Sequence, residues 1–144
     1  MEIEECLREG FLKKSRPDER EIQKELEESG KDFRDSQESL RSGKYKWCII
    51  QAYYSMFHSA RAVVFSAGYK ERRHFAIAVV LEQLVRDGKL ESSFAGDFKS
   101  AMFTREEADY DASYSREKAE QMLDMAQEFN ERMRDLLSAK GSKQ

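Results

Sequence analysis

The chain has 144 residues, enough for one domain with a buried core. Charged residues make up 37% and hydrophobic residues 40%, with one proline and seven glycines, a composition that favours helices over strands. The net charge of -3 argues against a protein held to nucleic acid by bulk electrostatics, although it leaves room for local basic patches.

The cysteines and the N-terminal residues indicate the cellular compartment of the protein. Cys6 and Cys48 stand alone without CxxC spacing, which favours a reducing compartment over a disulfide framework. The acidic N-terminus has no apolar stretch of the signal-peptide kind. The longest uncharged stretch, residues 47–60, is too short to span a bilayer. We therefore expect a cytoplasmic protein without membrane contact.

The N-terminal part of the chain predicts two helices. Residues 1–14 are expected to form a short helix that ends before Pro17, because proline disfavours helix at the preceding residue. Asp18 with Glu21 then resembles a capping box. A second helix should begin there and run to about residue 40, closed by the Ser-Gly that follows.

Residues 44–67 form the centre of the predicted fold. At about 100° per residue, apolar side chains cover more than half of the circumference of this helix. The narrow polar stripe that remains contains Lys44, Gln51, Ser55 and His58. A helix this apolar must pack against several neighbours. A glycine ends it, and the basic loop 69–73 follows.

Three more helices are predicted after this loop. His74 begins a helix that ends at residues 87–88, another should cover residues 92–109, and the last should cover about residues 115–138. Apolar residues follow one another in the last helix at alternating steps of three and four. Such a seam packs either within the chain or between subunits. Its members are Ala119, Met122, Ala126, Phe129, Met133 and Leu136.

These elements predict an all-α fold, an antiparallel up-and-down bundle of four long helices plus a short N-terminal helix. We expect an N-terminal segment over residues 1–17, the bundle over residues 18–138, and a disordered tail over residues 139–144.

Metal and cofactor chemistry has little support in the sequence. Glu71 and His74 have the E-x-x-H spacing of di-metal bundles, but only one copy exists and it lies at a loop–helix junction. No Gly-rich phosphate loop, GxSxG motif or HExxH motif is present. We expect neither a metal nor another cofactor.

Basic residues and histidines supply the first candidate site. Lys70, Arg72, Arg73 and His74 lie at a predicted helix N-terminus, where free backbone N–H groups and guanidinium groups favour anions. This cluster is either a solvated loop or a phosphate-binding site. His58, on the polar stripe, is either a hydrogen-bonded residue at a packing edge or a group that lines a cleft.

Arg105 is the second candidate. It continues the spacing of Phe94, Phe98 and Ala101, so a charge projects from an apolar face. Asp109 lies one turn further and can form an i,i+4 pair with it. A charge on a packed face needs a partner or a function, because burying it unpaired is costly. Arg105 is therefore either paired with Asp109 or held at a cleft to meet a phosphate or a partner protein.

Three blocks together resemble the HEPN superfamily, in the prokaryotic branch often encoded beside a minimal nucleotidyltransferase. Residues 52–62 (AYYSMFHSARA) resemble its characteristic helix, and the helix begun by His74 follows at the expected distance. Residues 105–110 (REEADY) resemble its Arg-x-x-x-Asp-Tyr element. The resemblance extends over residues 24–137. It implies a helical bundle that forms a homodimer, with the Arg element of each subunit facing a shared cleft.

Many members of this family are metal-independent ribonucleases that act as toxins. Their motif is Arg, four to six residues, then His, in which His transfers a proton and Arg stabilises phosphate charge. Counted from Arg105, the histidine position falls at residues 110–112, which are Tyr-Asp-Ala. The arginine is therefore carried over and the catalytic histidine is not, unless His58 or His74 folds into the same cleft.

Some relatives also have a tyrosine two residues after that histidine, which a partner nucleotidyltransferase modifies with AMP. When the histidine position is taken as Ala112, Tyr114 occupies the modified position.

Three interpretations remain. The first is a degenerate HEPN partner of a minimal nucleotidyltransferase in a toxin–antitoxin-like module, which binds nucleotide or RNA weakly through Arg105, Asp109, Tyr110 and the basic loop. The second is an active ribonuclease that uses Arg105 with His58 or His74. The third is a non-catalytic scaffold that only binds protein. We prefer the first, in which the chain is not itself an enzyme.

Overall fold

The computed structural model describes residues 1–110 and 114–142. Its elements are α1 (Ile3–Arg8), β1 (Leu12–Lys14), α2 (Glu19–Arg41), α3 (Tyr45–Ser66), β2 (Tyr69–Glu71), α4 (His74–Arg86), α5 (Ser92–Tyr110) and α6 (Arg116–Ser142). The predicted all-α class is confirmed. Residues 111–113, which include two of the three histidine positions, lie outside the described residues, as do residues 143–144 of the predicted tail.

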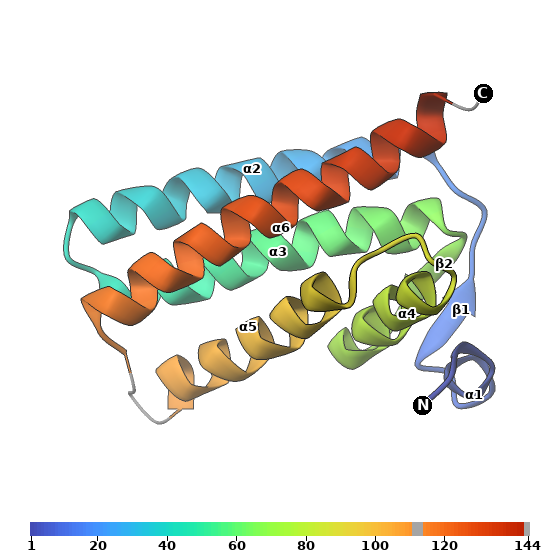
Figure 1. The fold of residues 1–144 in the computed structure, drawn as a ribbon, viewed down its shortest axis with the longest axis horizontal. Helices are drawn as coiled ribbons and strands as arrows, with labels where there is room; N and C mark the ends of the chain where they lie inside the picture. The colour runs from blue at the N-terminus through green and yellow to red at the C-terminus, as the bar shows by residue number, and fades with distance from the viewer. Residues whose placement is uncertain (111–113, 143–144) are drawn as a thin grey trace.

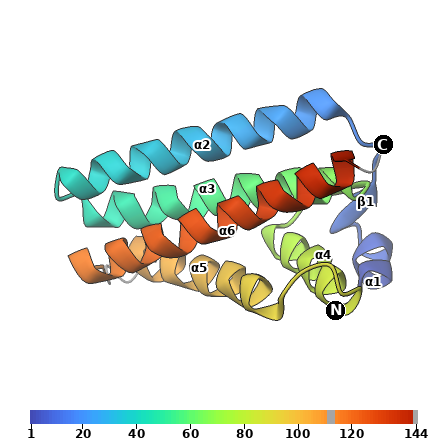
Figure 2. The same ribbon diagram turned by 45° about the horizontal axis from the view of Figure 1, so that its top comes forward.

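Helix α3 is the centre of the bundle, as its wide apolar arc predicts. It packs against α2, α4, α5 and α6. In Figure 1, α2 runs along one side of α3, while α4 and α5 follow one another along the other side. Figure 2 shows α6 as the third long helix beside α2 and α3. Four helices, α2, α4, α5 and α6, therefore border the helix that contains residues 52–62.

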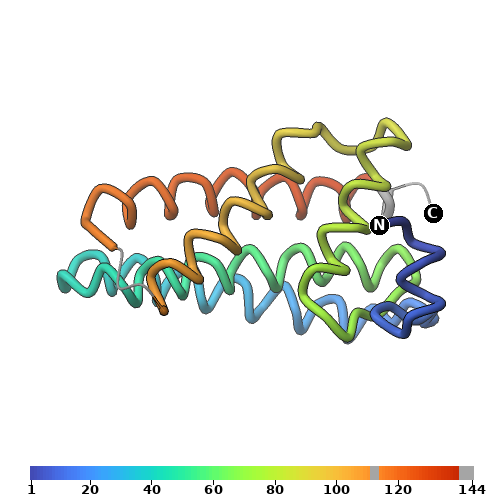
Figure 3. Tube along the Cα trace, turned by 90° about the horizontal axis from the view of Figure 1, so that it is seen from below, coloured from blue at the N-terminus to red at the C-terminus, as the bar shows by residue number. Residues whose placement is uncertain are grey.

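The two ends of the bundle differ. Figure 3 shows α1 and the end of α6 at one end, whereas the turn between α2 and α3 and the start of α6 lie at the other. The strands β1 and β2 lie at the same end as α1 (Figure 1). In the described part of the chain, no helix combines the length and the apolar character needed to cross a membrane.

Helix α2 begins and ends where the capping signals predict. The Asp18 carboxylate accepts a hydrogen bond from the backbone N–H of Arg20 at 2.9 Å, which caps the first turn. Gly43 has a φ of 74°, and Lys44 N–H donates to the carbonyl of Ser39 at 2.8 Å. This is a Schellman motif, which needs the left-handed conformation that glycine adopts without strain.

The predicted helix over residues 1–14 is wrong in its second half. Gly10, with a φ of 76°, ends α1 early, and the N–H of Phe11 donates to the carbonyl of Cys6 at 2.9 Å. The chain then forms β1, in which Leu12 is almost fully buried. A helix of only six residues is weakly stable by itself. The burial of Leu12 and the pairing with β2 therefore decide the conformation of residues 12–14.

The strand β1 pairs antiparallel with β2, so the basic loop predicted over residues 69–73 is in part a strand. The register places Leu12 opposite Glu71, Lys13 opposite Lys70, and Lys14 opposite Tyr69. No local pattern indicates this pairing, because the partners lie far apart in the sequence. The ribbon joins the N-terminal segment to the loop between α3 and α4.

The apolar seam of α6 packs inside the chain. Ala119, Met122, Ala126, Phe129 and Met133 are buried. The ring of Phe129 stacks on that of Phe98 in α5, with centroids 5.9 Å apart. The seam therefore supplies the core of the bundle rather than a subunit interface.

Polar residues also hold α2 and α6 to α3. Ser29 and Ser36 of α2 donate hydrogen bonds to the backbone carbonyls of Ser55 and Cys48, at 2.7 and 2.8 Å. Asn130 of α6 donates to the hydroxyl of Ser55 at 3.1 Å. Ser55, predicted on a polar stripe, is thus fully buried and satisfied by hydrogen bonds.

Candidate functional site

Arg105 of α5 lies over two tyrosine rings of α3. Its guanidinium carbon is 5.4 Å from the ring centroid of Tyr53 and 5.9 Å from that of Tyr54. Only 17% of the Arg105 side chain is exposed. The rings stabilise the cation by cation–π attraction and fix its position, since Tyr53 itself is fully buried. The arginine is therefore held at the surface of the core.

The pair with Asp109 does not satisfy this guanidinium. The Arg105 Nη1 and Asp109 Oδ2 atoms are 3.4 Å apart, well beyond the distance of a strong charge-assisted hydrogen bond. The Arg105 Nε is buried and has no hydrogen-bond partner among the described residues. An unmet buried donor is costly. The structural pair alone thus leaves hydrogen-bonding capacity for another group.

His74, the first residue of α4, reaches the same tyrosine. The Tyr53 hydroxyl and His74 Nδ1 are 3.2 Å apart, and the imidazole packs on Phe57 with ring centroids at 4.3 Å. Tyr53 thus lies between the Arg105 guanidinium and the His74 imidazole. Of the two histidines that could replace the missing catalytic one, His74 is the one joined to Arg105 through a shared side chain.

The surroundings of His74 disfavour its charged form. Burial is the largest cause that lowers the pKa of His74, and the positive charges of Arg105 and Arg61 lower it further, while Glu71 raises it. Burial likewise raises the pKa of Tyr53 well above its usual range. At neutral pH this site therefore combines a guanidinium, a neutral imidazole and a neutral phenol.

His74 is expected to titrate below its ordinary pKa of about 6.5 when followed by NMR. The imidazole of His74 binds a proton more readily in the unfolded chain than in the folded one. The stability linked to His74 is therefore fully present above about pH 6.5 and is lost as the pH falls through the folded-state pKa. In Arg105→Ala the midpoint should rise, because one repelling charge is gone. A midpoint at or above about 6.5 in the wild-type protein would contradict this arrangement.

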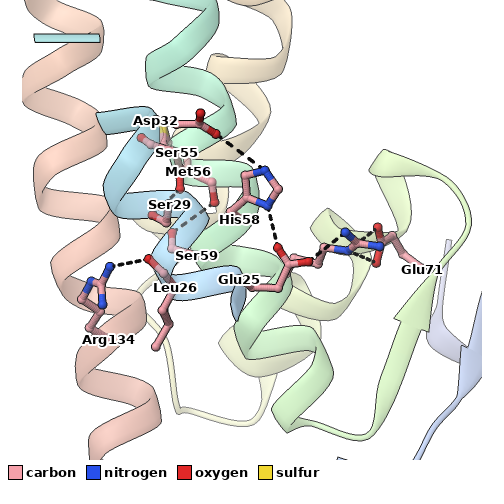
Figure 4. Close-up of polar contacts among 11 residues, drawn as sticks. Glu25, Leu26, Ser29, Asp32, Ser55, Met56, His58, Ser59, Glu71 and Arg134 are labelled. Carbon is pink, nitrogen blue, oxygen red and sulfur yellow. Dashed lines mark hydrogen bonds and ion pairs between the residues drawn. The ribbon is translucent and has the colours of Figure 1, made fainter. Parts of the chain in front are cut away.

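His58 lies beside the ring of Phe57, which also contacts His74, and it takes part in a network with α2. Its Nδ1 donates to the Glu25 carboxylate at 2.6 Å, and its Nε2 is 3.6 Å from Asp32 (Figure 4). Arg61 contacts the other Glu25 oxygen at 2.8 Å and Glu71 at 3.0 Å. We call Glu25, His58, Arg61 and Glu71 the Glu25 network. It ties α2, α3 and β2 together, and it fits the prediction of a hydrogen-bonded histidine at a packing edge.

Charge keeps Glu25 ionised despite its burial. Burial acts to raise the pKa of Glu25, but the hydrogen bond from His58 and the charge of Arg61 outweigh it, so the pKa is lowered. Nearby Asp32 has a raised pKa, mainly because of burial. The sequence does not reveal Glu25 and Arg61 as partners of His58. The spacing of His58 and Arg61, three residues apart in α3, is the one signal of a shared face.

The predicted basic cluster divides in the structure. Lys70 pairs with Glu21 at 2.6 Å and lies over the ring of Phe65 at 5.4 Å. Arg72 and Arg73 are exposed. Glu71 lies between Lys70 and Arg72 in the sequence, and its carboxylate forms an ion pair with Arg61. No group of three or more metal-ligating side chains occurs among the residues that the structure describes.

The tyrosines after Arg105 point to solvent. The exposed fraction is 78% for Tyr110 and 46% for Tyr114. Tyr110 has no ring or hydrogen-bond contact with Arg105 in the described part of the chain, so the structure does not bring these two predicted site residues together. The residues Tyr53 and Tyr54, which hold Arg105, lie in the block that resembles the HEPN helix but were assigned no role from sequence.

Arg105 does not line either of two hollows in the described surface. These hollows, of about 400 and about 320 Å³, are lined by other residues. The first lies beside β1 and the second between α4 and α5.

Comparison with known proteins gives consistent matches. The family model of the HEPN domain matches residues 7–136. A protein of Archaeoglobus fulgidus named "UPF0332 protein" is 26% identical over 90 residues, which are 62% of this chain and 72% of the relative. A protein of Methanocaldococcus jannaschii named "Putative toxin MJ0142" is 24% identical over 124 residues, 84% of each chain.

A solved structure supports the fold. The crystal structure of TT1696 from Thermus thermophilus superposes with a TM-score of 0.69 at 22% sequence identity. The match covers 80% of this chain and 97% of that chain. At this identity, the likeness concerns the arrangement of the helices alone.

Proposed function

The chain belongs to the HEPN family, and from that premise we propose that it binds nucleotide or RNA weakly through Arg105. In this proposal it is the non-catalytic partner of a minimal nucleotidyltransferase in a toxin–antitoxin-like module. The observation that carries the proposal is the Arg105 guanidinium, held on two tyrosine rings with its Nε lacking a hydrogen-bond partner among the described residues.

A phosphate group is the ligand that suits this arginine. A guanidinium donates parallel hydrogen bonds that match the oxygens of a phosphate, and it remains charged at every physiological pH. Its fixed position on Tyr53 and Tyr54 reduces the entropy lost on binding. Asp109 limits the affinity, because its carboxylate is only 3.4 Å from the same guanidinium and must be displaced or tolerated. The expected binding is therefore weak.

The same geometry argues against ribonuclease activity. The described histidine position holds Tyr110, whose largely exposed side chain is a phenol and not an imidazole. His58 is engaged by Glu25 and Asp32. Proton transfer at a phosphate held by Arg105 would thus have to use His74.

One observation favours the second candidate function, a metal-independent ribonuclease. His74 is neutral at neutral pH, as a general base must be, and it contacts the tyrosine on which Arg105 lies. Against this role, its Nδ1 is engaged with the Tyr53 hydroxyl, and Tyr53 separates it from the guanidinium. We retain this function as the alternative.

Incubation of the pure protein with RNA in a metal chelator separates the two. Under the proposal, RNA remains intact while AMP or a short RNA binds and the binding weakens as salt rises. Cleavage that persists in chelator, and that is lost in both Arg105→Ala and His74→Ala, would establish the ribonuclease instead. Absence of any nucleotide or RNA binding would leave only a protein-binding scaffold.

The partner and the assembly are tested separately. The relative named as a toxin supports a toxin–antitoxin-like setting. Co-expression with a minimal nucleotidyltransferase encoded beside this chain should give a stable complex. Exposure of Tyr114 makes it accessible to adenylylation, so ATP should add the mass of AMP to the peptide that contains it. Sedimentation of the chain alone should give a homodimer.

A further inference from the structure

We infer that the β1–β2 ribbon is a second polyanion-binding surface, across which a single-stranded RNA continues after its contact with Arg105. The inference rests on the proposed function and extends it from a single phosphate to a polymer. We call Lys13, Lys14, Arg16, Arg72 and Arg73 the basic ribbon. Lys13 and Lys14 belong to β1, Arg16 follows it, and the other two follow β2.

The basic ribbon has unbalanced charge. All five side chains are exposed, and among the described residues none of them has an ion pair with a carboxylate. Neighbouring cations behave differently, because Lys70 is paired with Glu21 and Arg61 with Glu25 and Glu71. Unpaired positive charge gathered at one end of a chain with a net charge of -3 marks a surface for an anionic partner.

The strand register places two lysines opposite one another. Lys13 lies directly opposite Lys70 in the antiparallel pair. Directly paired residues project from the same face of a ribbon, and like charges there are destabilising. Lys70 is compensated by Glu21 at 2.6 Å, whereas Lys13 has no such carboxylate among the described residues. A bound phosphate would remove this repulsion.

A hollow lies beside the ribbon. It has a volume of about 400 Å³, and its lining includes Lys14, Arg16 and Tyr69. Ser15, after β1, and Gly68, before β2, both line the hollow, and the Ser15 N–H donates to the Gly68 carbonyl at 2.9 Å. Gly68 has a φ of 94°, which glycine adopts without strain. Two cations and an aromatic ring in one hollow fit the phosphate and base of a nucleotide in a flexible strand.

The basic ribbon is linked along the chain to the residues that hold Arg105. Arg72 and Arg73 lead directly to His74, which contacts Tyr53, the residue under Arg105. The strand β2 (Tyr69–Glu71) alone covers about 7 Å at roughly 3.3 Å per residue, and Arg72 and Arg73 follow it. The cationic path is therefore longer than the phosphate group of a mononucleotide. This link to the arginine that we propose to bind phosphate favours RNA over an acidic protein as the partner.

The test compares RNA of about ten nucleotides with AMP over a range of salt concentrations. The variant Lys13→Gln/Lys14→Gln/Arg16→Gln removes three cations of the ribbon. We expect it to weaken RNA binding by at least about tenfold at low salt and to reduce the slope of log K against log salt by about 2. AMP binding at Arg105 should be unchanged, because these three residues lie outside that site.

A matched control keeps the change in net charge but moves it elsewhere. Lys24→Gln/Lys31→Gln/Lys89→Gln alters three exposed lysines on α2 and after α4, and it should keep the wild-type slope. The second variant Arg72→Gln/Arg73→Gln should reproduce the loss without altering β1. Thermal unfolding of each variant establishes that it is folded.

The outcomes separate this inference from the proposed function. If both ribbon variants bind RNA like the wild type while Arg105→Ala no longer binds AMP or RNA, the inference about the ribbon is wrong and the proposed function stands. If the ribbon variants lose RNA but Arg105→Ala binds AMP normally, the Arg105 site is wrong and the ribbon stands. If polyglutamate competes as well as RNA of equal charge, the ribbon recognises acidic protein, and the RNA assignment is wrong.

Discussion

Arg105→Ala is expected to weaken AMP and short-RNA binding by about 1.5–3 kcal/mol, roughly 10- to 150-fold, because it removes the charged donor of the site. Its folding should change by less than about 1 kcal/mol, since the lost cation–π contacts are offset by removal of a buried Nε that has no partner among the described residues. Titration calorimetry measures the first quantity and urea unfolding the second.

Two further variants sharpen the Arg105 prediction. Arg105→Lys keeps the charge but loses the planar fork and the stacking on the tyrosines, so it should recover only part of the binding. Arg116→Ala removes an arginine that is largely exposed and paired with Glu120, and it serves as the charge-matched control. Equal affinity of Arg105→Ala and Arg116→Ala would remove Arg105 from the site.

Glu25→Ala is expected to destabilise the fold by roughly 2–3 kcal/mol, the largest change in stability predicted for a polar residue here. The substitution leaves His58 and Arg61 without the carboxylate that both contact. The expected cost is smaller than for a fully buried ion pair, because Arg61 retains Glu71 and is itself about one-third exposed. Urea denaturation at neutral pH measures the difference.

The dependence of stability on acid pH identifies the contribution of the Glu25 carboxylate. Because the pKa of Glu25 is lowered in the folded state, its stabilisation is present above the ordinary glutamate pKa and is lost as pH falls below that value. The wild type should therefore lose its advantage over Glu25→Ala in acid. Glu27→Ala changes an exposed glutamate of the same helix and is the control. Equal stability of the two variants at neutral pH would show that the Glu25 network contributes nothing.

The candidate site was only partly predictable. The sequence singles out Arg105 because it is a charge that continues an apolar spacing, and it singles out His74 because it begins a helix after a basic segment. It does not show that Tyr53 joins them, because Tyr53 and Arg105 belong to different helices far apart in the chain. It also leaves His58 and His74 equivalent as substitutes for the missing histidine. Only the packing of α3 directs one toward Arg105 and the other toward α2.

Local chemistry in the sequence determined the class of the fold, the central position of α3, and ends of helices such as the Asp18 cap and the Gly43 turn. These features depend on periodicity and on hydrogen bonds between residues a few positions apart. The β1–β2 ribbon, the partners of His58 and the tyrosines under Arg105 were decided by tertiary structure alone. They join segments distant in the chain, and which of them meet depends on how the whole core packs.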